Sequence, residues 1–379
     1  MRAILENLLG KNLPDHLGLA YDRWAPLDLE TGKIPNDRRG PWLAKLRGYR
    51  ISSHYRYAYE RWLESLRADG SRAAVVTMAS RLLVGHGSPA PTEIGLTVHH
   101  TWSVPVIPGS ALKGLLNHFI DAVYGPDELG VHPMSPSLSD ETRERARFRG
   151  VTWDEKRHIP LYGPGEVHRA LFGAPMSKTD EHFPGSGETI GGIVFHDALF
   201  VPGSAGDRPF AEDVLTVHQK QYYDKHGREG GPNDYDAPIP ISFLTVKPGA
   251  QFLLALSGPP EWTDLALREL RGALMGWGVG GKTAAGYGQI MAEAWTIVAG
   301  SDPPAKKRAA VDAFQAWLTH QEPRPSQRTL LERFTSEWLP RRQEIGAEER
   351  QEIGRIFKKE IKSPKLGADR DRLLAEWHT

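Results

Sequence analysis

The chain contains no cysteine, and this absence excludes disulfides, cysteine nucleophiles and thiolate metal sites. It has no apolar run long enough to span a bilayer, and its first residues, MRAILENLLGKN, lack the apolar core of a signal peptide. A cytoplasmic protein is therefore expected. The chain also lacks net charge, because 47 Lys and Arg balance 47 Asp and Glu. Since free-standing nucleic-acid binders usually carry a basic excess, any nucleic-acid surface here must be local or shared with partners.

The rest of the composition is that of a folded protein. The 379 residues are 40% hydrophobic and 25% charged, which is enough to bury a large core and to form more than one domain. The 39 glycines and 29 prolines indicate long ordered loops between the regular elements.

The hydrophobic pattern divides the chain into three regions. Residues 1–70 are predicted to form a helical segment packed on the core. Residues 71–300 are predicted to form the main domain, with polar insertions at about 126–188 and 202–240. Residues 303–379, which follow the linker-like SDPPAKKR, are predicted to form a helical appendage.

The main domain has a recognisable order once the insertions are removed. Apolar segments read strand, helix, strand, strand, helix, strand, with a strand pair predicted around Lys247, Pro248 and Gly249. This is the split βαβ order of the ferredoxin-like (RRM-like) α+β fold. It predicts an antiparallel sheet with two helices on one face and leaves the other face free to bind a ligand.

The stretch VIPGSALKGLL, residues 106–116, runs from an extended segment into a helix. Apolar residues at helical spacing predict a helix over about 110–124, with Ser110 as its N-cap. The free N–H groups at the helix start, with Lys113 one turn in, suit a phosphate. An ordinary capped helix explains the same residues, so both interpretations stay open at this point.

The stretch GWGVGGKT, residues 276–283, satisfies the P-loop pattern G-x-x-x-x-G-K-[ST] of nucleotide-binding proteins. A P-loop follows a strand and opens a helix. Here a predicted helix precedes the glycines and a predicted strand follows them, so a nucleotide hydrolase is disfavoured.

The same loop is unusually rich in glycine. Six glycines in the thirteen residues 276–288 exceed the need of a helix-to-strand connection, and glycine lets backbone N–H groups approach a ligand. Lys282 and Thr283 are predicted to reach a phosphate, and Tyr287 to stack on a base. A tight connection that needs glycine for positive φ is the alternative.

Taken together, the PGS turn and the glycine-rich loop resemble the RAMP superfamily of CRISPR-associated proteins. The resemblance extends over about residues 15–297 and is closest to the branch that supplies the sixth subunit of the Cmr (type III-B) effector complex. It is carried by LGLAYDRWAP, RLLVGHGSPAPTEIGLTVHHTWSVPVIPGSALKG, GGIVFHDAL, and DVLTVHQKQYYDKHG followed by GPNDYDAPIPISFLTV.

The resemblance implies a non-catalytic, RNA-binding subunit of a cytoplasmic ribonucleoprotein in antiviral defence. Such a subunit holds the 3′ part of the guide (CRISPR) RNA and its target RNA beside other Cmr-type subunits, and no cofactor or membrane is implied. Where the family often has an arginine this chain has Asn117, which weakens an extra phosphate clamp. The residues implied to bind RNA are Gly109, Ser110, Lys113, Gly278, Gly280, Gly281, Lys282, Thr283, Gly286, Tyr287 and Gly288.

The second insertion contains VLTVHQKQYYDKHGREG, which the resemblance suggests is a projecting hairpin wedged into an RNA duplex. Lys220, Lys225 and Arg228 would meet phosphates, and Tyr222 and Tyr223 would stack on bases. A solvated loop is the alternative.

An endoribonuclease of the same fold is a further alternative, because histidine can act as a general base near neutral pH. No triad order, carboxylate pair or metal-ligand spacing marks a catalytic or metal site. His99 and His100 are predicted to alternate faces on a strand, which prevents joint chelation. Asp197 is interpreted as structural or RNA-adjacent. The other candidate bases are His118, His168, His196 and His218.

Overall fold

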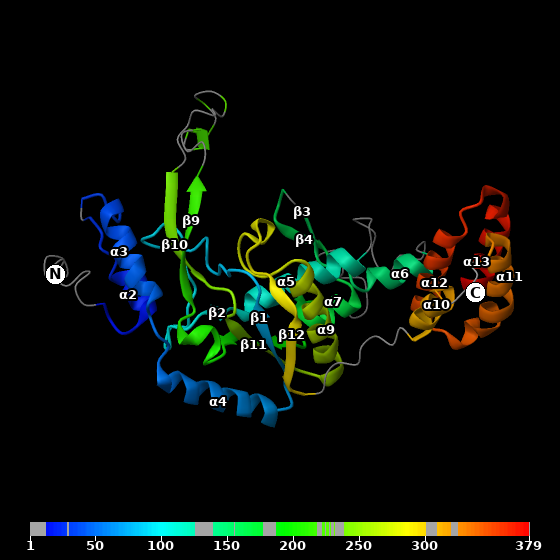
Figure 1. Ribbon diagram of the computed structural model, residues 1–379, viewed down its shortest axis with the longest axis horizontal. Helices are drawn as coiled ribbons and strands as arrows, with labels where there is room; N and C mark the ends of the chain where they lie inside the picture. Colours follow the sequence, from blue (N-terminus) through cyan, green and yellow to red (C-terminus); the bar gives the residue numbers. More distant parts are fainter. Residues whose placement is uncertain are drawn as a thin grey trace. The chain divides into compact units, whose positions relative to one another are not determined.

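The computed structural model describes most of the chain. The described residues are 13–28, 30–125, 139–154, 156–176, 187–217, 222–223, 225–226, 228, 231, 239–300, 309–319 and 325–378. The chain divides into two compact units, Met1–Pro303 and Pro304–Thr379. Figure 1 labels the elements of both units. No described helix combines the length and the apolar character needed to cross a membrane.

The first unit is organised around an antiparallel sheet. The central strands β1 and β11 bury side chains on both faces of the sheet, because helices cover both faces. The mixed helix and sheet content and the antiparallel sheet expected from the sequence are confirmed. The strand order is β12 (Ile290–Ala299), β1 (Arg72–Met78), β11 (Gln251–Ser257), β8 (Ala198–Phe200) and β2 (Val106–Ile107), and β7 (Val194–Phe195) also pairs with β11.

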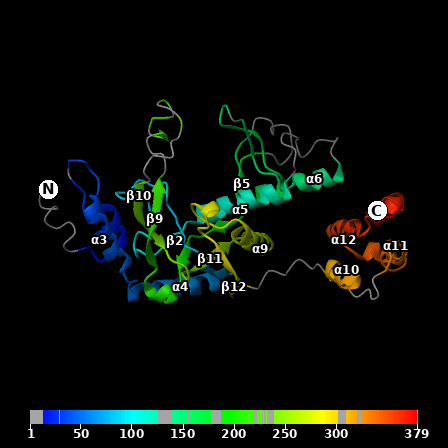
Figure 2. The same ribbon diagram turned by 45° about the horizontal axis from the view of Figure 1, so that its top comes forward.

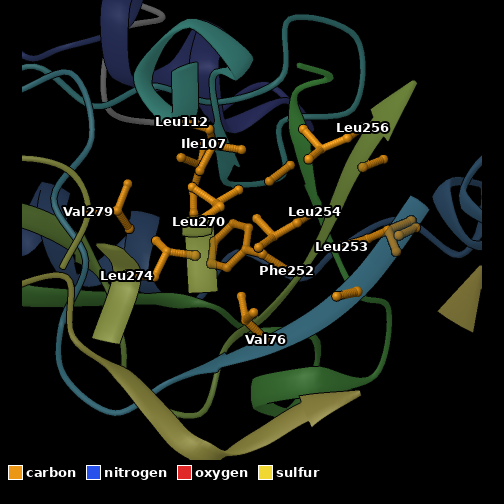
Figure 3. Close-up of a cluster of buried hydrophobic side chains, with 14 of the residues drawn as sticks. Val76, Ile107, Leu112, Phe252, Leu253, Leu254, Leu256, Leu270, Leu274 and Val279 are labelled. Atoms are coloured by element: carbon orange, nitrogen blue, oxygen red, sulfur yellow. The ribbon is translucent and has the colours of Figure 1, made fainter. Parts of the chain in front are cut away.

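Two helices pack together on one face of this sheet. They are α5 (Gly109–Tyr124) and α9 (Pro260–Gly276), and the sequence predicted both from apolar residues at helical spacing. Figure 3 shows Leu112 of α5 and Leu270 of α9 close to Phe252 of β11, all fully buried. Burying one such leucine contributes about 1.5–3 kcal/mol. This shared core holds the start of α5, which follows the edge strand β2, and the end of α9, which leads into the loop before the opposite edge strand β12.

The opposite face of the sheet is not free, contrary to the prediction. Helix α4 (Ser53–Ala68) covers it, as Figures 1 and 2 show, and its residues Tyr55, Tyr59 and Leu66 are buried in the core that contains β1 and β11. The Tyr55 hydroxyl donates to the Phe200 carbonyl at 2.6 Å, which ties the helix to β8. The sequence predicted a helical segment packed on the core here, but not the surface that it covers.

The second insertion forms a separate hairpin. Strands β9 (Phe210–Val217) and β10 (Ile239–Val246) pair with each other in a two-stranded sheet. Helices α2 (Leu17–Arg23) and α3 (Asn36–Arg47) pack against the base of this hairpin. The helices of the N-terminal segment thus pack on two different sheets. Helix α4 packs on the central sheet, whereas α2 and α3 pack on the hairpin.

This pairing overturns one prediction about the strands. The chain around Lys247, Pro248 and Gly249 connects β10 to β11, but β10 pairs with β9 while β11 lies between β1 and β8. The predicted strand pair is therefore wrong, because partners far apart in the sequence compete for each strand.

The first insertion also contains regular elements in its described residues. Helix α7 packs against α5 and α9, and its residues Val167 and Leu171 join the core. The elements are α6 (Asp140–Ala146), β3 (Thr152–Asp154), β4 (Ile159–Tyr162), α7 (Glu166–Phe172), β5 (Gly173–Ala174) and β6 (Thr189–Ile190).

The second unit is helical and has its own aromatic core. The rings of Phe334 and Phe357 stack with centroids 4.1 Å apart, and Phe314, Trp338 and Trp377 surround them. The elements are α10 (Ala309–Thr319), α11 (Gln327–Arg333), the π-helical turn Phe334–Trp338, the 3₁₀ turn Leu339–Glu344, α12 (Ala347–Glu360) and α13 (Gly367–His378).

Two glycines in α5 provide a matched test of this packing. A Cβ on Gly109 would lie 2.0 Å from the Phe195 carbonyl oxygen, whereas a Cβ on Gly114 meets nothing within 4 Å. We expect Gly109→Ala to destabilise the first unit by about 1–3 kcal/mol through overpacking. We expect Gly114→Ala to stabilise it by about 0.5–1 kcal/mol, because alanine is the better helix former. Hydrogen exchange of the β11 amides measures the stability of this unit alone, and equal effects of the two variants would contradict the packing described.

Candidate functional site

The turn predicted to hold a phosphate is a crowded helix start. Helix α5 begins at Gly109, and the extended residue Pro108 is its N-cap, so the prediction of Ser110 as N-cap is wrong. The Asp197 carboxylate accepts a hydrogen bond from the Gly109 N–H at 2.7 Å. This carboxylate already provides the negative charge that a helix N-terminus attracts. A phosphate is thereby kept from the first amide, while the exposed Ser110 and the half-buried Lys113 remain at the surface.

The glycine-rich loop packs on the segment that follows β1. The Gly281 N–H donates to the Leu83 carbonyl at 2.7 Å, and the Gly288 N–H donates to the Arg81 carbonyl at 2.7 Å. A Cβ on Gly280 would lie 2.5 Å from the Leu83 oxygen. These contacts require the two backbones to approach closely.

The remaining glycines satisfy the backbone geometry of the loop. Gly278, Gly280, Gly286 and Gly288 all have positive φ, and a Cβ on Gly288 would lie 1.9 Å from the Val279 oxygen. Steric and conformational demands thus account for these four of the six glycines. Their number gives no independent evidence of a ligand.

Lys282 is the charged residue of this loop. Its backbone is left-handed, with φ 60° and ψ 34°, a conformation uncommon for a residue other than glycine. Its carbonyl accepts from the N–H groups of Ala285 at 2.9 Å and Tyr287 at 3.3 Å, which holds the turn. Among the described residues, no carboxylate forms an ion pair with Lys282. The hydrogen bonds of the loop therefore fix the backbone of Lys282, whose side chain is half-buried and forms no ion pair with a described carboxylate.

The P-loop match has no structural support. Helix α9 precedes the loop, and only the short 3₁₀ turn Thr283–Ala285 separates Lys282 from the approach to β12. A phosphate-binding P-loop needs a helix that begins at this place.

Tyr287 joins the loop to the hairpin. Its hydroxyl donates to the Asp213 carboxylate of β9 at 2.6 Å, and the Arg81 guanidinium forms an ion pair with the same oxygen at 2.7 Å. Arg81 also donates to the Glu212 carbonyl at 2.9 Å. The Tyr287 ring packs beside Leu83 and the β9 and β10 residues of a small apolar cluster. Its hydroxyl is occupied by the bond to Asp213, so only the exposed part of its ring is available for the predicted stacking on a base.

This network shifts the acidity of its members. Burial, with the hydrogen bond to Asp213, raises the pKa of Tyr287 to about 12. Burial acts to raise the pKa of Asp213, but hydrogen bonds from Tyr287, the Val214 amide and Arg81 outweigh it and lower that pKa below its ordinary value. The charged form of Asp213 is therefore the one that the fold stabilises.

The hairpin tip carries aromatic residues. Tyr222 and Tyr223 contact each other edge to face with centroids 5.4 Å apart, and Tyr223 is 64% exposed. Lys225 and Arg228 are also exposed. Lys220 and His218 lie outside the described residues. The hairpin predicted from the sequence exists, and its contact with RNA stays a prediction.

The histidines occupy different surroundings. His99 and His100 lie at a turn rather than on a strand, and their rings stack with centroids 4.9 Å apart, so the predicted alternation of faces is wrong. His168 is buried, and burial lowers its pKa to about 4. His196 Nε2 lies 2.6 Å from the Ser257 hydroxyl. His118 is exposed on α5. In the described part of the chain, no three His, Asp or Glu side chains are grouped to hold a metal ion.

Sequence reasoning missed two residues of this region, Arg81 and Asp213. Both lie within stretches that resemble the family, but nothing in the local pattern indicates that they meet. Their ion pair depends on the hairpin base lying against the segment after β1, where Leu82 and Val246 form an isolated antiparallel bridge.

Comparison with known proteins identifies the family. A family model described as the RAMP superfamily matches residues 75–290. The chain belongs to the RAMP superfamily. It is 28% identical over 262 residues to the CRISPR system Cmr subunit Cmr6 of Pyrococcus furiosus, an alignment covering 65% of this chain and 74% of that protein. The resemblance stated from the sequence motifs is thus confirmed.

Two solved structures are also similar to this RAMP protein. One is a chain of the type III-B Cmr-beta complex bound to cognate target RNA, with 17% identity and a TM-score of 0.43, covering 71% of this chain and 76% of that chain. The other is the crystal structure of Cmr6 from Pyrococcus furiosus, with 26% identity and a TM-score of 0.31, covering 58% and 97% respectively.

We expect Tyr287→Phe to loosen the hairpin of this RAMP domain without unfolding the central sheet. The change keeps the ring but removes a hydrogen bond to a charged group, which is worth about 1.5–3 kcal/mol. Hydrogen exchange should therefore accelerate at the β10 amides and stay unchanged at β11. Tyr223→Phe, which removes an exposed hydroxyl at the tip, serves as the control, and equal protection in both variants would argue against the network.

We expect the docking of the hairpin to weaken in acid. The folded-state pKa of Asp213 is lowered, so its stabilising contribution is complete above the ordinary value of 3.8 and is lost as the pH falls through the lower folded-state value. Asp213→Asn should have a lower free energy of unfolding than the wild type at neutral pH. This difference in free energy should shrink as the pH falls below the folded-state pKa of Asp213. Urea unfolding of both proteins at several pH values measures it, and a gap independent of pH would contradict this assignment.

Proposed function

We propose that this chain is a non-catalytic RNA-binding subunit of a type III-B CRISPR ribonucleoprotein effector complex. In this role it holds the 3′ part of the guide RNA and its target RNA, with other Cmr-type subunits as neighbours. Membership of the RAMP superfamily and the similarity to Cmr6 support the proposal.

The proposal includes a domain organisation. The strand order β12, β1, β11, β8, with α5 and α9 on one face, fits a ferredoxin-like RAMP domain over residues 71–300. Residues 1–70 form its helical N-terminal segment, and residues 303–379 a helical appendage. The division of the chain into compact units after Pro303 supports the last boundary.

The observation that carries the proposal is the unpaired Lys282 on a fixed backbone. A lysine without a carboxylate partner is available to an external anion, and RNA phosphates are the anions that such side chains contact in nucleic-acid complexes. The backbone of this lysine adopts a conformation that side chains rarely take, and surrounding hydrogen bonds maintain it. Strained residues of this kind concentrate at functional sites.

The neighbouring elements suggest a path for the RNA. Figures 1 and 2 show the loop, drawn in yellow, beside α5, and the Trp277 ring at the loop start contacts Phe119 of α5 with centroids 5.3 Å apart. The bond from Tyr287 to Asp213 connects the loop to the hairpin. We infer that phosphates meet Lys113 and Lys282 while bases approach the tyrosines of the tip.

The positions of the described histidines support a non-catalytic role. His168 is buried, and His196 lies within hydrogen-bond distance of Ser257, which agrees with a structural role for these two residues. The neutral charge of the whole chain agrees with a subunit that binds RNA on one local surface and shares the RNA with its neighbours.

The test is the loss of the Lys282 charge. We expect Lys282→Ala to weaken binding of single-stranded guide RNA by about five- to tenfold and to reduce the slope of log K against log salt by about 0.7, the value for one phosphate contact. Filter binding by the purified chain at several salt concentrations measures both quantities, and RNA retained by the assembled complex measures the consequence.

The matched control is Lys33→Ala, which removes the same charge from an exposed turn before α3. Lys282→Arg should retain most of the binding because it keeps the cation. If Lys282→Ala and Lys33→Ala bind RNA equally well, the assignment of the loop is wrong.

A further inference from the structure

A pocket of about 370 Å³ lies on the side of the sheet that α4 covers. Its walls include no residue of the glycine-rich loop or the hairpin, and its wall residue Asp197 also contacts the start of α5. Its volume falls in the range of about 300–1,000 Å³ that is typical of ligand sites. The walls include Tyr55 and Trp62 of α4, His99 and Trp102 from the turn before β2, and His196 and Asp197 between β7 and β8.

The walls are aromatic and held in place. The rings of Tyr55 and Trp102 lie 6.0 Å apart, and those of Trp62 and His196 lie 5.1 Å apart in an edge-to-face arrangement. The Tyr55 hydroxyl is bonded to the Phe200 carbonyl, and His196 is bonded to Ser257. The pocket is therefore formed before any ligand arrives, which lowers the entropic cost of binding.

The charge of the lining is negative. Burial lowers the pKa of His99 and of His196, so both rings are neutral at neutral pH. Asp197 is then the one formal charge among these six residues. It is an exposed side chain, and one of its oxygens accepts from the Gly109 N–H. Within the described residues, its other oxygen has no recorded partner.

This combination selects among possible ligands. Aromatic faces beside a carboxylate attract a cation and repel a phosphate. A nucleotide would bring its phosphate toward Asp197 and also toward Asp69, whose charge acts on His196. A guanidinium is planar, stacks on tryptophan, and donates to a carboxylate.

We propose that this pocket binds an arginine side chain of a neighbouring protein subunit, with the guanidinium stacked on Trp62 or Trp102 and hydrogen-bonded to Asp197. The existence of a neighbouring subunit rests on the proposed function, whereas the chemistry of the pocket does not. The volume also leaves room for the residues that flank the arginine. The α4 side of the domain is thus a protein-binding face, distinct from the loop that carries Lys282.

The experiment measures peptide binding to the purified full-length chain. The probes are acetyl-Gly-Arg-Gly-amide and the same peptide with citrulline, which has nearly the shape of arginine but no charge. Saturation-transfer NMR, in which the peptide signals are observed, detects weak binding. We expect saturable binding of the arginine peptide and roughly tenfold weaker binding of the citrulline peptide, the effect of losing a charge-assisted pair.

Two variants locate the binding. Asp197→Asn removes the charge but keeps an oxygen that accepts from the Gly109 N–H, so α5 stays capped. This variant should bind the arginine peptide only as weakly as the wild type binds the citrulline peptide. Trp62→Leu should weaken both peptides, and circular dichroism checks that it is folded. Lys282→Ala should leave peptide binding unchanged, which separates failure of this proposal from failure of the RNA assignment.

The proposal is overturned if the arginine peptide does not bind, if citrulline binds equally well, or if Asp197→Asn has no effect. Displacement of the arginine peptide by adenosine monophosphate would also overturn it, because a nucleobase would then be the better occupant. In the assembled complex, Asp197→Asn should lower the recovery of neighbouring subunits relative to the wild type.

Discussion

The ion pair and the hydrogen bond that Arg81 and Tyr287 form with Asp213 connect the elements of the candidate site. They join three segments that are distant in the sequence: the chain after β1, the glycine-rich loop and the hairpin strand β9. A carboxylate taken partly out of water is costly unless its partners satisfy it, and here two donors share one oxygen. The same carboxylate thus contacts both the loop and the hairpin. Together with the bridge between Leu82 and Val246 and the apolar cluster that contains Phe243, it holds the base of the hairpin against the segment after β1.

The covering of both sheet faces decides where a ligand can bind. In many small RNA-binding domains of this general build, the open sheet face stacks bases. Here α4 occupies that face and ties itself to β8 through the Tyr55 hydroxyl. The RNA contacts that we propose therefore lie on the loops and on the hairpin. Since loops tolerate sequence variation without loss of the core, this arrangement allows the contacts to change while the sheet is kept.

Two charged side chains distinguish the two proposed sites. Lys282 stands unpaired on the loop, whereas Asp197 both caps α5 and gives the aromatic pocket its negative charge. The same carboxylate accepts from the start of α5 and is the one formal charge among the six named wall residues of the pocket. In our proposals, Lys282 contacts RNA and the pocket receives a basic side chain of a protein neighbour.

The sequence by itself determined what depends on neighbouring residues. Helical spacing defined α5 and α9, a continuous apolar run defined β1, and the two glycine-containing motifs identified the superfamily. It did not determine that α4 covers the second face, that β10 pairs with β9, or that Asp197 rather than Ser110 satisfies the start of α5. Those outcomes depend on contacts between distant segments, and several partners compatible with the same local pattern compete for them. Only the tertiary structure decides which partner is near enough to bind.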